Sequence, residues 1–279
     1  MGKRNTYSVG GNTLSVIEMG DSADPVAIFL HGIPASAELW RSSMSRIAQD
    51  GWYCMAPDLP GFGQTEIKVK DPSAYTLEGM AKLLLQWMMQ EGLGEVWLIS
   101  HDIGGGVAQW MLSEKPLLFT KATFSNSIAG DSWPVKDVAP MIKAAKTKMF
   151  AWMALLGFFK KKDLHRAIAK TFRQQPIEMD EFECIFYDGK FSNFQRAKKF
   201  QKMLRSLDNK YTQEILGKLS LVNVPVQLVW AMDDIYQPWG ISGVMLKEAF
   251  PKATVTQIHN CGHFLQIDDV DSYTEALLR

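Results

Sequence analysis

One short stretch, residues 96–106, limits what this chain can fold into more than any other. It reads Val-Trp-Leu-Ile-Ser-His-Asp-Ile-Gly-Gly-Gly, an apolar run that stops abruptly and continues into the glycine-rich start of an amphipathic segment. A buried strand that enters a tight turn and then a helix produces this pattern. Asp102 lies at the apex of the predicted turn. Small residues at Ser100 and Gly104 suit a strained turn, whose flanking residues come too close for large side chains.

Composition narrows the class of protein. With 279 residues, of which 47% are hydrophobic, the chain can bury a large core as one α/β domain, or one domain plus an insertion. Thirty basic residues balance thirty acidic ones, so neither nucleic acid nor an anionic membrane is expected as the main partner. Three distant cysteines without metal-ligand spacing, and a start without a signal-peptide apolar region, favour a reduced, cytoplasmic protein.

Strand and helix patterns alternate along most of the chain, which is typical of a mostly parallel α/β sheet. Alternating residues around Gly10-Gly11-Asn12 predict an antiparallel hairpin before it. Strands are expected over residues 6–9, 14–19, 26–30 and 53–57, from 96 to the turn at Asp102 (the elbow), and over 122–127, 224–231 and 254–258. Helices are expected over residues 37–49, 75–90 and 270–278, and after the glycines at 104–106.

This rhythm breaks at Asp131-Ser132-Trp133-Pro134, and the chain is then helical in pattern to about Gly217. A helical insertion between two late strands predicts a cap over the carboxyl edge of the sheet, where α/β sheets bind ligands. We therefore expect a core domain of residues 1–130 and 218–279, and a helical cap domain of residues 131–217.

Several segments together resemble the α/β-hydrolases, in the branch that contains epoxide hydrolases and haloalkane dehalogenases. The resemblance runs nearly end to end and combines the elbow and the mid-chain cap with four motifs. These are His31-Gly32-Ile33-Pro34, the loop from Asp58 to Thr65, the segment from Trp230 to Pro238, and Asn260-Cys261-Gly262-His263-Phe264. The combination is far more specific than any one piece.

The resemblance implies a triad in the order nucleophile, acid and histidine, which falls on Asp102, Asp234 and His263. Each position has an alternative. An aspartate after a strand is often only a helix cap, and Asp233 could replace its neighbour as the acid. Of the other histidines, His31, His101 and His259 are expected to be structural, and His165 lies in the cap.

An aspartate nucleophile narrows the chemistry. A carboxylate is already anionic at neutral pH, and at a saturated carbon with a leaving group it forms a stable ester. The histidine then activates the water that hydrolyses this ester, and the acid orients the imidazole. The backbone N–H groups of Ile33 and Ile103 are the expected oxyanion donors. Such a site needs no metal and no organic cofactor.

Departures from the family favour an epoxide over a halide. Haloalkane dehalogenases typically carry a halide-binding tryptophan directly after the nucleophile, where this chain has Ile103. Fluoroacetate-type dehalogenases carry an arginine near the nucleophile to hold the substrate carboxylate, and no arginine occurs there in this chain. Candidate substrate-binding residues in the cap are Trp133, Trp152, Tyr187 and Tyr211, with core packing as their alternative role. Haloalkane hydrolysis remains an alternative, as does a cofactor-free lyase, isomerase or ligand-binding protein in which Asp102 is not a nucleophile.

The cap segment from Met149 to Phe159, followed by three lysines, invites a membrane interpretation. We favour a helix that packs over the pocket and has a solvated basic end, because the stretch is too short to span a bilayer. Methionines and aromatics in the cap suit an adaptable apolar pocket. A small-to-medium hydrophobic organic molecule is therefore the expected partner of a monomer or homodimer.

Overall fold

The predicted sheet is present in the computed structural model of the protein, which describes residues 2–174 and 176–279. Within these residues, eight strands form one sheet in the order β1-β2-β4-β3-β5-β6-β7-β8. β2 runs antiparallel to β1 and β4, and the remaining pairs are parallel. The strands are β1 Lys3–Val9, β2 Asn12–Met19, β3 Val26–Leu30, β4 Tyr53–Pro57, β5 Val96–Asp102, β6 Phe119–Ser127, β7 Val226–Ala231 and β8 Thr254–Ile258.

The continuous apolar runs form central strands because helices cover both faces of the sheet. All seven residues of β5 are buried. Successive side chains of a strand point to opposite faces, so Val96 and Leu98 enter one hydrophobic core while Trp97 and Ile99 enter the other. The elbow at the end of β5 is therefore fixed from both sides.

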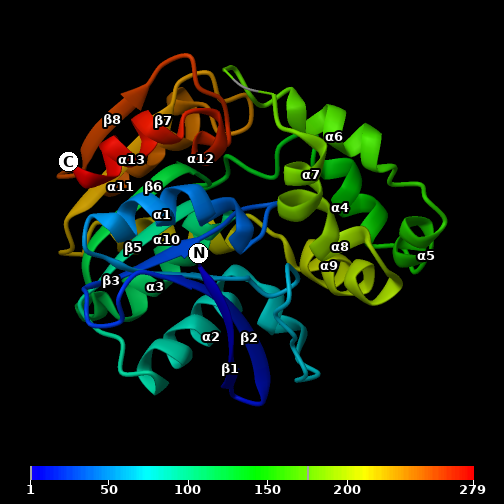
Figure 1. Cartoon of the computed structure of the whole chain (residues 1–279), viewed down its shortest axis with the longest axis horizontal. Helices are drawn as coiled ribbons and strands as arrows, with labels where there is room; N and C mark the ends of the chain where they lie inside the picture. The colour runs from blue at the N-terminus through cyan, green and yellow to red at the C-terminus, as the bar shows by residue number, and fades with distance from the viewer. Residues whose placement is uncertain (1, 175) are drawn as a thin grey trace.

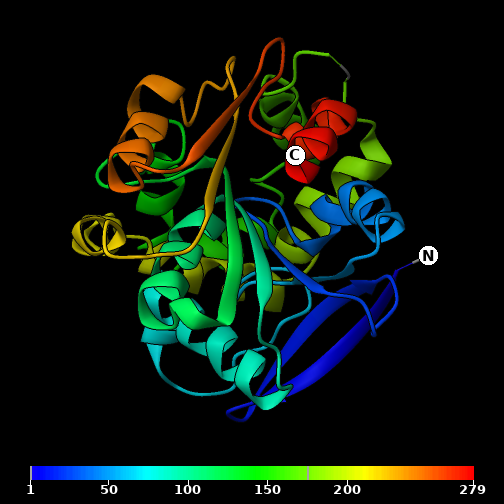
Figure 2. The same ribbon diagram turned by 90° about the vertical axis from the view of Figure 1, so that its left-hand side faces the viewer.

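Two helical layers flank the sheet (Figure 2). One face packs against α1 Arg41–Gln49, α12 Leu265–Asp268 and α13 Val270–Leu278. The other packs against α2 Leu77–Gln90, α3 Ile103–Glu114, α10 Lys210–Leu219 and α11 Val244–Ala249. Short turns of 3-10 helix cover Ala37–Trp40, Pro72–Tyr75 and Pro116–Leu118, and single π-helical turns cover Glu183–Tyr187 and Trp239–Gly243.

The first turns of two predicted helices differ from expectation. The helix expected over residues 75–90 begins at Leu77, because the side chain of Thr76 accepts the Gly79 N–H at 3.0 Å and caps it there. The helix expected over residues 37–49 is divided into a 3-10 turn and α1. Periodicity alone does not separate these two helical forms, whose hydrophobic spacing is nearly the same over one turn.

The helices that connect β6 to β7 in the sequence lie beyond the carboxyl end of the sheet (Figure 1). They are α4 Ala139–Ala145, α5 Phe150–Leu155, α6 Lys161–Ala169, α7 Met179–Phe182, α8 Asp188–Phe191 and α9 Phe194–Ser206. The predicted cap boundary at residue 217 falls inside α10, which packs on α3 through a bond from the Trp110 indole to the Tyr211 carbonyl. The exact division into core and cap stays a prediction. Among the described helices, none is long and apolar enough to cross a bilayer.

The segment around α5 only partly follows expectation. Phe150, Ala151 and Ala154 are buried, and Phe159 packs against Phe191 with ring centroids 5.2 Å apart. Five other large apolar side chains of the segment are exposed, namely Met149, Trp152, Leu155, Leu156 and Phe158. No residue from 149 to 159 lines the cavity that Asp102 and His263 line. The prediction that this stretch covers the pocket is wrong. Apolar composition reveals that a helix buries one face, but not which partner it meets.

Candidate active site

Asp102 occupies a strained turn between β5 and α3. Its backbone has φ 50° and ψ −122°, a conformation that L-residues rarely adopt, and its side chain is buried. The side chain makes no capping bond to α3, so the helix-cap alternative is excluded. Asp102 instead lines a cavity.

The small residues around the elbow are required by close backbone approach. A Cβ atom at Gly104 would lie 2.4 Å from the Leu30 carbonyl oxygen and 2.6 Å from that of His31. At Gly32, a Cβ would lie 2.4 Å from the Cβ of Asp102. The glycines therefore let the loop after β3 come into contact with the elbow.

That loop supplies a donor to the carboxylate. The backbone N–H of Ile33 donates to Asp102 Oδ2 at 2.8 Å, and the Ile103 N–H also stabilises the charged carboxylate. Both predicted oxyanion donors thus face Asp102. His31 fixes the loop, because its Nε2 accepts the Leu59 N–H at 3.0 Å and its Nδ1 donates to the Gly32 carbonyl at 3.0 Å. Burial lowers the pKa of His31 to about 4, which keeps the imidazole neutral.

His263 and Asp234 form the predicted pair. The Nδ1 of His263 lies 2.8 Å from Asp234 Oδ2, and both side chains are buried. The Tyr236 N–H donates to the other carboxylate oxygen at 2.7 Å. Asp233 is exposed and its backbone bonds elsewhere, so Asp234 is the acid that the fold brings to His263.

The charges of these groups depend on one another. Burial alone would lower the pKa of His263, but Asp234 and Asp102 outweigh it and the pKa is raised. For Asp234, burial would raise the pKa, but His263 and backbone donors reverse the sign and the pKa is lowered. Burial raises the pKa of Asp102, against the opposing effects of His263 and the two backbone N–H groups.

His101 lies behind the pair, as a structural neighbour. Its ring centroid is 4.6 Å from that of His263, and its Nδ1 donates to the Ser125 carbonyl at 3.0 Å. Burial lowers the pKa of His101 well below the ordinary value, with the charge of His263 acting in the same direction. His101 stays uncharged beside His263 and does not line the cavity, so it is no competing base there.

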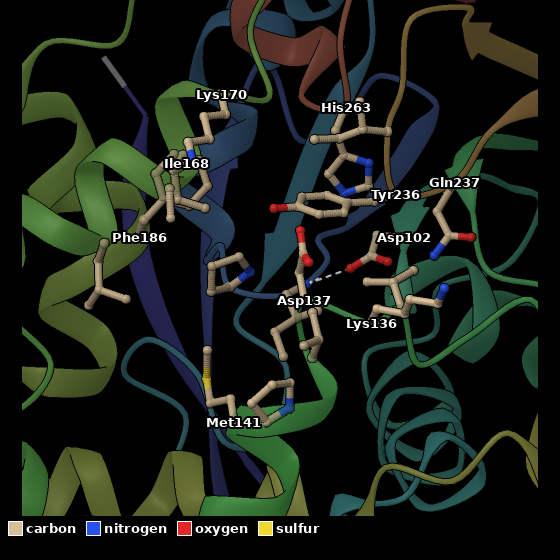
Figure 3. A pocket seen from close by; sticks show the side chains of 18 of the residues that line it. Asp102, Lys136, Asp137, Met141, Ile168, Lys170, Phe186, Tyr236, Gln237 and His263 are labelled. Atoms are coloured by element: carbon tan, nitrogen blue, oxygen red, sulfur yellow. Dashed lines mark hydrogen bonds between the residues drawn. The ribbon is translucent and has the colours of Figure 1, made fainter.

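Asp102 and His263 open into one cavity of about 480 Å³ between the sheet and the helices above it (Figure 3). Its walls are mostly apolar and come from the segment before α4, from α4, α6 and α8, and from the π-helical turn over Glu183–Tyr187. Among the wall residues are Val138, Met141, Leu164, Ile168, Phe186 and Phe191. Such a shape fits a small organic molecule with few polar groups.

None of the four predicted substrate-binding aromatics lines this cavity. The Trp133 indole N–H donates to Thr212 Oγ1 at 2.7 Å and is not free for a ligand. Trp152 is 53% exposed and packs on Phe194. Tyr187 packs among cap phenylalanines, and Tyr211 packs at the core face of α10. These four assignments to the cavity are corrected: the cap turns the side chains into its own packing or outward.

Two residues of the site were missed. Tyr236 lines the cavity together with Asp102, and its ring is edge-on to His263 with ring centroids 5.3 Å apart (Figure 3). Asn126, at the end of β6, donates to Asp234 Oδ2 at 2.6 Å and accepts the Ala231 N–H at 2.9 Å. The sequence position gives a signal for each residue. Tyr236 follows the acid Asp234 by two residues, and Asn126 ends a parallel strand, at the edge of the sheet where the other parallel strands also end.

The family model described as the alpha/beta hydrolase fold matches residues 25–270. This match covers most of the chain, and the eight-stranded sheet, the elbow and the late histidine agree with it. The chain belongs to the α/β-hydrolase fold family and is an enzyme of that superfamily. A solved α/β-hydrolase fold protein from Burkholderia ambifaria superposes with a TM-score of 0.85 over 98% of this chain and 96% of that one, at 18% identity.

Two curated relatives come from the expected branch. "Epoxide hydrolase 2" of Siraitia grosvenorii is 32% identical over 114 residues, which are 41% of this chain and 35% of that protein. A haloalkane dehalogenase of Bradyrhizobium diazoefficiens is 31% identical over 106 residues, 38% of this chain and 33% of that protein. The chain thus matches about a third of the length of each relative.

Proposed function

We propose that this enzyme opens an epoxide on a small-to-medium hydrophobic substrate through a covalent ester on Asp102. The observation that carries the proposal is the environment of the Asp102 carboxylate. The Ile33 N–H holds Oδ2 at 2.8 Å in the position of an oxyanion, while the carboxylate opens into the same cavity as His263. We assign the attack on substrate to the other oxygen, Oδ1.

In the first step, Oδ1 attacks an epoxide carbon, the ring C–O bond breaks, and the Tyr236 hydroxyl protonates the departing oxygen. In the second step, His263 Nε2 takes a proton from water, and the resulting hydroxide attacks the carbonyl carbon of the ester, which is Cγ of Asp102. Asp234 stabilises the imidazolium, and Ile33 and Ile103 donate to the oxyanion. Collapse returns the His263 proton to the diol. The proton of the regenerated Asp102 carboxyl group restores the phenol through solvent.

The nature of the donors favours an epoxide. A phenol that lines the cavity can give a proton to an alkoxide, whereas a departing halide needs only hydrogen-bond donors. Among the described residues that line the cavity there is no tryptophan, and the indole of Trp133 is already bonded to Thr212. The name of the Siraitia relative adds support, while the dehalogenase relative keeps carbon–halogen hydrolysis as the alternative.

The mostly apolar walls of the cavity, rather than its charged side chains, favour a neutral substrate. Asp137 lines the cavity with Asp102, and its charge contributes to the raised pKa of Tyr236, after burial as the main cause. Lys136 and Lys170 line the same cavity, so its two carboxylates are balanced by two cationic side chains and its charges alone do not select an anionic haloacid. Uncharged epoxides and alkyl halides are therefore the compounds to test first.

Replacing Tyr236 with phenylalanine is expected to reduce epoxide turnover by about 10²-fold, the usual contribution of one positioned proton donor. Any turnover of a matched bromoalkane should change by only a few fold, because bromide leaves without a proton. Steady-state kinetics on both compounds measure the difference, with Tyr187→Phe as the control outside the cavity. Equal losses on both compounds would contradict a role for Tyr236 as proton donor.

The pH dependence of ester hydrolysis should follow His263. Only the neutral imidazole can take a proton from water, and its pKa is raised, so kcat should fall as the pH drops through that raised pKa. Asp234→Asn removes the main charge that raises it. We expect the acid limb of the kcat profile to move to lower pH, while kcat falls by roughly 10²-fold or more. Asp233→Asn, at the exposed neighbour, should alter neither; an unmoved limb in Asp234→Asn would refute the pairing.

A further inference from the structure

The outer end of the cap carries an apolar patch that the proposed reaction does not use. It consists of five exposed side chains on α5, on the residue before it and on the turn after it: Met149 at 61%, Trp152 at 53%, Leu155 at 55%, Leu156 at 70% and Phe158 at 66% exposure. Residues three and four apart share one side of a helix, so the members on α5 form one face. A cluster of this kind, unlike scattered exposed side chains, marks an interaction surface.

The buried side of the same segment holds this patch rigidly outward. Phe150 is fully buried and packs against Phe159 with centroids 4.9 Å apart, and Ala151 and Ala154 are buried beside it. In Figure 1, α5 lies at the edge of the molecule, beyond α4 and α9. Turning the patch inward would expose the phenylalanines that anchor α5.

Lysines flank the apolar patch on both sides in the sequence. Residues 138–162 contain six lysines and no aspartate or glutamate, in a chain whose charges balance overall. Lys161 pairs with Glu183. The other five are exposed, and no ion pair with a described residue engages them; they are Lys143, Lys146, Lys148, Lys160 and Lys162. The segment therefore combines exposed apolar side chains with unpaired positive charge before and after them in the sequence.

We propose that this patch docks the enzyme on the surface of a bilayer that contains anionic lipids. Apolar side chains with a tryptophan enter the boundary between headgroups and acyl chains, and the flanking lysines meet lipid phosphates and carboxylates. A second copy of the chain fits the patch less well. A symmetric contact would bring two sets of unpaired lysines together in one interface.

Docking would also place the cavity close to lipophilic compounds. α5 connects α4 and α6, whose residues Met141 and Ile168 line the cavity, and Phe159 contacts Phe191 in the cavity wall. Hydrophobic molecules concentrate in bilayers, so a bound enzyme meets a higher local concentration of them. The docking itself does not depend on the reaction at Asp102, and a binding assay tests it separately from the proposed function.

The test is flotation of the full-length protein with phosphatidylcholine vesicles, with and without phosphatidylserine. We expect binding to the anionic vesicles, weakened by added salt, and little binding to the neutral ones. The double variant Trp152→Glu/Phe158→Glu should lose at least about tenfold in binding, and each of Lys146→Gln and Lys148→Gln about fivefold. Leu117→Glu and Leu221→Glu are matched controls at isolated leucines, 95% and 84% exposed, and should leave binding unchanged.

Three outcomes would overturn the proposal. The first is no flotation of the wild-type protein with anionic vesicles, and the second is equal loss in the control variants. The third is a wild-type dimer in sedimentation velocity that Trp152→Glu/Phe158→Glu converts to monomer while vesicles bind neither protein, which would assign the patch to a second copy. Thermal unfolding of each variant verifies that its fold is intact, which is expected because every substituted side chain is exposed.

Discussion

Replacing Asp102 with asparagine is expected to reduce epoxide hydrolysis by about 10⁴-fold or more, the scale of loss when a nucleophile is removed from a triad. The amide is nearly the same size, and its oxygen can still accept the Ile33 N–H that now bonds Oδ2 at 2.8 Å. What disappears is the anionic oxygen that attacks the substrate. Steady-state kinetics, with thermal unfolding of the same sample, distinguish a chemical loss from a folding defect.

Asp137→Asn is the matched control, because its carboxylate lines the same cavity while the Ile33 N–H donates to Asp102. It should change turnover by no more than a few fold. If Asp102→Asn retains activity on the epoxide that the wild-type protein hydrolyses, Asp102 is not the nucleophile. A lyase, isomerase or binding protein on this fold would then be the better account.

Replacing Gly104 with alanine is expected to lower the free energy of unfolding by about 3 kcal/mol, at the upper end for overpacking in a close-packed site. The added Cβ would lie 2.4 and 2.6 Å from the carbonyl oxygens of Leu30 and His31, and these are backbone atoms of a central strand and its end. Neither can move without separating β3 from the elbow. Urea denaturation monitored by circular dichroism measures the change.

Gly217→Ala provides the opposite result as a control. Gly217 lies in α10, is exposed, and has no atoms within 4 Å of the place where a Cβ would be. Alanine there should stabilise the protein by roughly 0.5–1 kcal/mol, through a smaller loss of backbone freedom on folding. Similar effects of the two substitutions would contradict the close approach at the elbow.

The fold was largely predictable because the hydrophobic periodicity of most segments distinguishes strands from helices. Strands β3 and β5 are apolar on both faces, and the end of the strand–helix alternation after β6 predicts the helices between β6 and β7. The juxtaposition of Asp102, Asp234 and His263 followed from a rule of topology: parallel strands end at one edge of the sheet, and loops after different strands meet there. The same rule would have found Asn126 at the end of β6.

The cavity walls were not predictable in the same way. Which cap aromatics face the substrate depends on how short helices pack on one another, and one residue of rotation exchanges a buried for an exposed side chain. Trp133 is bonded to Thr212, far along the chain, and sequence spacing gives no sign of that contact. Tyr236 belongs to the loop that carries the acid, so the family's use of cap tyrosines does not point to it.

The central claim is a covalent ester on Asp102, and intact-mass analysis of His263→Ala tests it most directly. This variant keeps the nucleophile and the oxyanion donors but lacks the base that activates water, so an ester should form and persist. With a neutral epoxide, we predict a mass increase equal to the whole substrate, located on Asp102 by peptide mapping; with a bromoalkane, the increase would be the alkyl group alone. An unmodified His263→Ala protein, with an epoxide that the wild-type enzyme hydrolyses, would contradict the account.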